Sequence, residues 1–155
     1  MKKHVYVFVW SVIFFTGCSS TKKLEINAPF TLGEAYGQEW FTEEIPKKTG
    51  YDLIIPIISL DEDDAVLQNL YHLGQMSDIK IELRETGMVA VAEFPSKDKS
   101  QETSGLNEEP FPFLLGLTEA VLSYLDNDKV RYIKINGIRQ NPAIAYPTEL
   151  ARRDN

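Results

Sequence analysis

The residues best suited to chemistry in this sequence are four glutamates that flank a tryptophan. They are Glu34, Glu39, Glu43 and Glu44, on both sides of Trp40. Hydrolysis of a glycosidic bond needs two carboxyl groups, one as general acid and the other as nucleophile or base, and an aromatic ring can stack on a sugar. Spacing along a chain does not set the separation of carboxyl groups in space. Burial of Trp40 in the core is therefore the simpler interpretation.

Aromatic side chains mark two candidate surfaces for a partner or a glycan. The first comprises Tyr36 and Trp40. The second comprises Phe111 and Phe113, which alternate with prolines at the end of a long polar stretch over 95–112. Rings on such a stiff backbone can dock onto a partner. They can equally seal one end of the domain, which is the interpretation that we favour.

Two further polar groups are weaker candidates. Asp61, Glu62, Asp63 and Asp64 supply the hard oxygen ligands that calcium prefers. Successive side chains on an extended chain point in opposite directions, however, so a solvated loop is expected there. His72 could act as a base, but no nucleophile motif accompanies it, and we interpret it as a partly exposed strand residue. We expect no metal, cofactor or catalytic residue.

Cys18, the single cysteine, ends a segment whose residue types follow each other in the order typical of an export signal. Lys2 and Lys3 precede an apolar run over 5–15 of about 11 residues, whereas a membrane-spanning helix needs roughly 20. Two small residues, Thr16-Gly17, then lead into the cysteine. The arrangement resembles the lipobox of bacterial lipoproteins, in which the cysteine thiol is acylated and becomes the first residue of the mature chain.

This resemblance implies that residues 1–17 are removed and that a lipid on Cys18 anchors the chain in the bacterial envelope. The residue after the cysteine is Ser19 rather than Asp. By the sorting rule of enterobacterial lipoproteins, that choice favours the outer membrane. An acylated Cys18 leaves no thiol for a disulfide, a nucleophile or a metal site. The membrane is thus the first expected partner.

The chain is acidic. Its formal net charge of −7 becomes −9 once the two lysines of the signal are removed. Nucleic-acid binding depends on Lys and Arg to neutralise phosphates, so we expect no nucleic-acid partner. The simplest role of the charge is to keep an exported domain soluble. A partner steered by charge would be basic.

The elements that must position these residues are short strands. Residues 51–60 are apolar and β-branched, and Pro56 within them requires an edge position or a bulge. Alternation of apolar and polar residues predicts one hairpin over 79–94, and turn-forming residues predict another over 119–135. Further strands are expected at 65–73 and 143–146.

Together these elements predict an all-β fold of about seven to eight strands. We expect an antiparallel β-sandwich, immunoglobulin-like in the broad sense, with a small β-barrel as the alternative. The domain is placed at 31–149. A flexible tether over 18–30 precedes it, and a polar tail over 150–155 follows it.

Four short segments resemble a family of small, uncharacterised bacterial envelope lipoproteins. They are residues 35–40, 70–74, 119–124 and 142–147. The relatives carry a glycine-rich stretch after the tryptophan, where this chain has residues 41–46 without glycine. The family has no assigned activity, so the resemblance implies a lipoprotein with one β domain and no particular mechanism.

These observations favour a lipid-anchored, non-catalytic binding or scaffold module of the bacterial envelope, with an envelope protein as partner. Two alternatives stay open. One is a carboxylate-based enzyme that acts on glycans near Trp40. The other is an immunity or inhibitor lipoprotein whose acidic surface blocks a basic enzyme.

Overall fold

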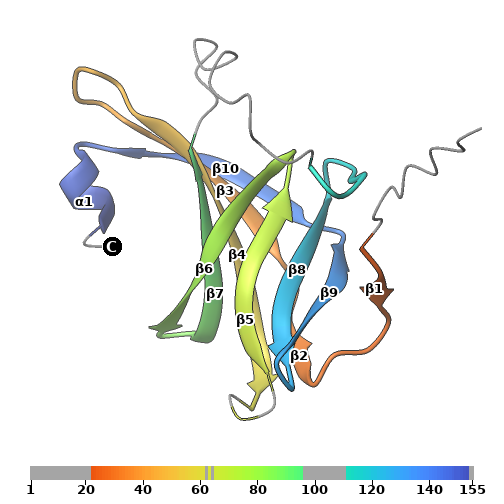
Figure 1. Ribbon diagram of the computed structural model, residues 1–155. Coiled ribbons are helices and arrows are strands. Elements are labelled where there is room, and N and C mark those ends of the chain that lie inside the picture. Colours follow the sequence, from red (N-terminus) through yellow and green to blue (C-terminus); the bar gives the residue numbers. More distant parts are fainter. Residues whose placement is uncertain (1–21, 62, 64, 96–110, 154–155) are drawn as a thin grey trace, which may run out of the picture.

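The structure is a computed structural model that describes residues 22–61, 63, 65–95 and 111–153. Cys18 lies outside these residues. Ten strands and one short helix form within them (Figure 1). The elements are β1 (Leu24–Glu25), β2 (Phe30–Leu32), β3 (Tyr36–Thr42), β4 (Thr49–Leu60), β5 (Val66–His72), β6 (Gln75–Arg84), β7 (Gly87–Pro95), β8 (Glu119–Asp126), β9 (Lys129–Asn136), β10 (Arg139–Tyr146) and α1 (Glu149–Arg153).

The strands make one open sheet with the order β1-β9-β8-β5-β6-β7-β4-β3-β10, and β2 pairs with the end of β4. Strand β6 joins the two halves of this sheet. Its first residues, Gln75–Asp78, pair with β5, and its later residues, Ile79–Arg84, pair with β7. The sheet therefore turns at β6, and its two halves face each other around a shared core (Figure 1).

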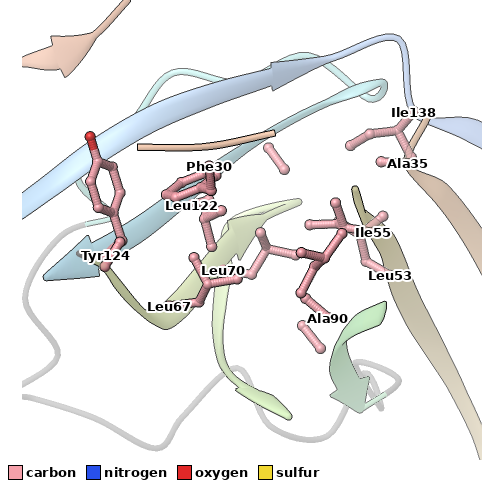
Figure 2. Close-up of a cluster of buried hydrophobic side chains, with 14 of the residues drawn as sticks. Phe30, Ala35, Leu53, Ile55, Leu67, Leu70, Ala90, Leu122, Tyr124 and Ile138 are labelled. Carbon is pink, nitrogen blue, oxygen red and sulfur yellow. The ribbon is translucent and has the colours of Figure 1, made fainter. Parts of the chain in front are cut away.

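The core is built from the residues that each half directs inward. Leu53 and Ile55 of β4 meet Leu70 of β5 and Leu122 of β8, all almost completely buried (Figure 2). The ring of Phe30 contacts that of Tyr124 edge-to-face, with centroids 4.9 Å apart. Burial of apolar surface is the main stabilising term, at about 25 cal/mol per Å².

The predicted all-β class is confirmed, with more strands than the expected seven to eight. The structure also differs from a purely antiparallel sandwich. Its sheet is mixed, because β1 runs parallel to β9 and β10 runs parallel to β3. Both predicted hairpins are present as β6–β7 and β8–β9. The second closes on Asn127 and Asp128, whose positive φ angles of 48° and 60° suit a tight hairpin turn.

Pro56 lies in the interior of β4. On one side of that strand, β3 and β2 pair with successive parts of β4, and Pro56 falls between those two parts. The pairing with β3 ends at Ile54, and the pairing with β2 begins at Ile57. The carbonyl of Pro56 faces this break and accepts a hydrogen bond from the Gly33 amide at 2.8 Å. No ladder bond is lost to the missing N–H, and the register shift between β2 and β4 is the irregularity that the proline predicts.

Both ends of the domain differ from the sequence prediction. Within the predicted tether, β1 pairs with β9, and Leu24 lies opposite Tyr132. Helix α1 begins at Glu149, the last residue of the predicted domain, and continues into the predicted polar tail. A five-residue helix has little stability of its own, so contacts with the sheet must hold it, and sequence periodicity does not reveal those contacts. Across the described residues, no helix combines the length and apolarity needed to cross a membrane.

Candidate functional site

A hollow of about 1200 Å³ lies on the outer face of the half-sheet formed by β10, β3, β4, β7 and β6. Its floor consists of Ile54 from β4 together with Val89 and Val91 from β7. These side chains point away from the main core, yet they are buried and form a small cluster of their own with Tyr36 packed against it. The hollow thus has an apolar floor outside the core.

Strands β3 and β10 supply the wall of the hollow. The parallel pairing places Arg139 beside Tyr36 and Ile144 beside Trp40. Tyr36, Ile144 and Tyr146 all line the hollow, so aromatic and aliphatic groups surround the floor. Among the residues that the structure describes, Arg139 has no carboxylate partner. Its guanidinium group is therefore available to a ligand.

The charge of the hollow is opposite in sign to that of the chain. Its lining contains four cations and three carboxylates, namely Lys80, Arg84, Arg139 and Arg152 against Asp52, Glu82 and Glu93. The carboxylates are ion-paired with lining cations, and the pairs include Arg84 with Glu82 at 2.7 Å and Lys80 with Glu93 at 2.9 Å. The excess positive charge lies with Arg139.

Arg152 holds α1 against this face of the sheet. Its Nη2 donates to both carboxylate oxygens of Asp52, at 2.8 and 2.9 Å, and lies 3.5 Å from a carboxylate oxygen of Glu93. Its guanidinium carbon lies 4.0 Å from the centre of a Trp40 ring, and the Trp40 indole N–H donates to Asp52 at 3.0 Å. Both a cation–π contact and charge-assisted hydrogen bonds therefore position the helix.

The carboxylates beside Trp40 are not the ones that the sequence suggested. Asp52 and Glu93 lie opposite each other on β4 and β7. The hydrogen bond from Lys80 lowers the pKa of Glu93, against partial burial, and Arg152 lowers it further. A general acid at neutral pH needs a raised pKa, so Glu93 is suited to holding Arg152 rather than to donating a proton.

The four predicted glutamates do not gather around the indole. Glu34, Glu39 and Glu43 are exposed, and Glu39 pairs with Tyr51 on the other face of β3 from Trp40. Glu44 accepts a hydrogen bond from the Glu149 amide at 3.0 Å and so caps α1. Trp40 itself is not in the core. It lies half-buried on the outer face, where the bare backbone of Gly50 makes room for its ring.

The two predicted aromatic surfaces are separate in the structure. Tyr36 and Trp40 share the outer face of β3, whereas Phe111 and Phe113 pack on the other half of the sheet. The Phe113 ring lies 5.0 Å from Tyr71 of β5 and 5.6 Å from Tyr132 of β9, and Phe111 lies 6.1 Å from Tyr71. The two phenylalanines therefore pack against the tyrosines of β5 and β9, and that they seal one end of the domain stays a prediction.

His72 is buried, and the prediction that it is partly exposed is wrong. The residue ends β5, where its ring stacks on Tyr51, with centroids 5.4 Å apart, and contacts Phe94. Its Nδ1–H donates to the carbonyl oxygen of Glu119 at 2.8 Å. Its Nε2 is buried and, in the described structure, has no hydrogen-bond partner. Burial lowers the pKa of His72 below its ordinary value of 6.5.

This burial makes the stability of the fold depend on pH. Because the pKa of His72 is lowered in the folded state, the neutral ring favours folding above pH 6.5, and stability is lost as the pH falls below that value. Hydrogen bonds lower the pKa values of Glu93 and Glu119, so these two carboxylates contribute to the stability of the fold at neutral pH and lose that contribution as the pH falls. Urea unfolding at about pH 8 and about pH 5.5 should show a smaller difference for His72→Phe than for the unmodified chain. Equal differences would contradict this role for the ring.

Of the acidic run after β4, the structure describes Asp61 and Asp63, and Asp63 lies in a turn. The carboxylate of Asp61 accepts a hydrogen bond from the Asp63 amide at 3.1 Å, and both side chains are exposed. Glu62 and Asp64 lie outside the described residues. No group of three or more potential metal ligands occurs within the part of the chain that the structure describes.

The fold and the hollow together define a class: an all-β protein built on one open mixed sheet, with an apolar and aromatic hollow on the outside of one half. No known protein family, curated protein or solved structure matches the chain. Function must therefore be inferred from the chemistry of this site and from the sequence around Cys18.

Proposed function

We propose that the chain is a lipid-anchored, non-catalytic binding module of the bacterial envelope and that the hollow is its binding surface. The observation that carries this proposal is the apolar floor of Ile54, Val89 and Val91, surrounded by aromatic rings on the outside of the sheet. Binding sites typically combine such an apolar lining with a few polar groups that orient the ligand. Arg139, which has no carboxylate partner among the described residues, supplies a cation for that purpose.

The same features suggest the chemistry of the ligand. An apolar or ring-containing body would pack against Tyr36, Ile144 and Tyr146 above the buried floor, and an acidic group would meet Arg139. The carboxylates of the hollow are occupied by ion pairs, which suits binding better than acid–base catalysis. The lipid anchor is inferred from the sequence around Cys18.

Site-specific photo-crosslinking in cells tests this proposal. A benzophenone amino acid replaces Ile144, which is exposed and lines the hollow. The matched control replaces Val130, an exposed aliphatic residue on β9. We expect Ile144 to give a reproducible crosslinked species, identified by mass spectrometry as an envelope protein, glycan or lipid, and we expect Val130 not to give it.

Reversal of one charge in the hollow tests whether the crosslinked species binds through Arg139. Arg139→Glu should reduce the crosslink from Ile144 by about tenfold or more, since loss of a charge-assisted hydrogen bond costs about 1.4 kcal/mol or more. Lys129→Glu, at the β8–β9 turn, should leave the yield unchanged. Equal yields for both variants would contradict the assignment of the hollow as the binding surface.

A further inference from the structure

The segment that leads into β8 exposes an unusual amount of apolar surface. Residues 111–117 contain no charged side chain. Within them, Leu114 is fully exposed and Leu117 is 78% exposed. Exposed apolar side chains gathered in one short segment are typical of a contact with another molecule or with a membrane.

This segment lies next to the start of the described chain. Phe113 packs on Tyr71 and Tyr132. The Nζ of Lys22 lies over the same two tyrosine rings, 5.9 and 4.9 Å from their centres. Figure 1 shows the segment before β8 and the start of β1 at the same end of the molecule. Residues far apart in the sequence thus form one surface.

The position of Cys18 in the sequence limits how far its lipid can be from this surface. Cys18 and Lys22 are four peptide units apart. At about 3.6 Å per residue, four units span at most about 14 Å. A lipid on Cys18 would therefore hold the membrane surface close to Lys22, and so close to the tyrosine rings that Lys22 shares with Phe113, the residue before Leu114.

We propose that the segment 111–117 rests in the surface of the bilayer that holds the lipid on Cys18, with Leu114 and Leu117 entering the acyl-chain boundary. This inference rests on the anchoring that we proposed above. Apolar side chains gain free energy by such burial, and tyrosines are favoured at the level of the headgroups. The ammonium group of Lys22 would lie near lipid phosphates. The bilayer would then fix the orientation of the domain as well as its location.

The test uses the full mature protein reconstituted into vesicles of phosphatidylethanolamine and phosphatidylglycerol. Leu117→Cys provides a thiol for an environment-sensitive fluorophore. Leu83→Cys is the matched control, because Leu83 is 85% exposed and lies in β6 near the β6–β7 turn, at another end of the molecule (Figure 1). We expect a spin label on the lipid acyl chains to quench the fluorophore at position 117 at least twofold more than the one at position 83.

Titration of free thiols in the unmodified protein separates the two proposals. Acylated Cys18 leaves no free thiol per chain, whereas one free thiol would overturn the anchoring and, with it, this inference. When no free thiol is found and the intact mass includes the acyl chains on Cys18, equal quenching at positions 117 and 83 would overturn the membrane contact alone and leave the anchor in place. Stronger quenching at position 117 in the anchored protein supports the inference.

Discussion

Replacement of Leu53 by alanine is expected to lower the free energy of unfolding by about 2–5 kcal/mol. Leu53 is completely inaccessible to solvent and lies in the middle of β4, between β3 and β7. Loss of its side chain removes apolar contacts and leaves a cavity that the paired strands cannot readily close. Small domains have total stabilities of about 5–15 kcal/mol, so this change is a large fraction of the whole.

The control for Leu53→Ala lies on the same strand. Ile58 of β4 points away from the core and is 69% exposed, so Ile58→Ala should change the free energy of unfolding by less than about 1 kcal/mol. Urea denaturation monitored by tryptophan fluorescence measures both values. Similar losses for the two variants would contradict the assignment of the inward face of β4.

Gly37→Ala is the second substitution with a large expected effect. Gly37 is buried in β3, where the side chain of Tyr51 from β4 lies across its backbone. A β-carbon at position 37 would lie 1.8 Å from the Tyr51 hydroxyl oxygen and 2.4 Å from the ring carbon that bears it. The ring must move, which disturbs its stacking on His72 and its hydrogen bond with Gln140. We expect a loss of about 1–3 kcal/mol in the free energy of unfolding.

A double-mutant cycle identifies the cause of that loss. In a Tyr51→Ala background the obstructing ring is absent, so the additional cost of Gly37→Ala should fall to a fraction of its value in the unmodified chain. The two changes should therefore show a coupling energy of at least about 0.5 kcal/mol. Additive effects would mean that the glycine is needed for a reason other than room for Tyr51.

Local patterns in the sequence were sufficient to predict the all-β class and much of the strand arrangement. The alternation over 79–84 and the turn residues at 126–128 encode the two hairpins directly, because hairpin partners are neighbours in sequence. The parallel pairs β1–β9 and β3–β10 join segments about a hundred residues apart. Such pairings depend on tertiary packing, and no local propensity specifies them.

The candidate site was predicted only in part. Tyr36 lines the hollow and was identified as part of a surface with Trp40, which lies outside the lining. Arg139, Tyr146 and Arg152 were not identified, because they reach the hollow through the parallel addition of β10 and the docking of α1. One signal was available in the sequence. Residues 53–58 and 88–92 are apolar at nearly every position, which indicates strands buried on both faces. The outward face of these two strands forms the floor of the hollow.

The crosslink from Ile144 in living cells is the most direct test of the central claim, namely that the outer face of β10, β3, β4, β7 and β6 binds a ligand with an acidic group. We predict one reproducible species from Ile144 that is lost in Arg139→Glu, kept in Lys129→Glu and not formed from Val130. The same species from Ile144 and Val130, with a yield that does not depend on Arg139, would contradict the claim.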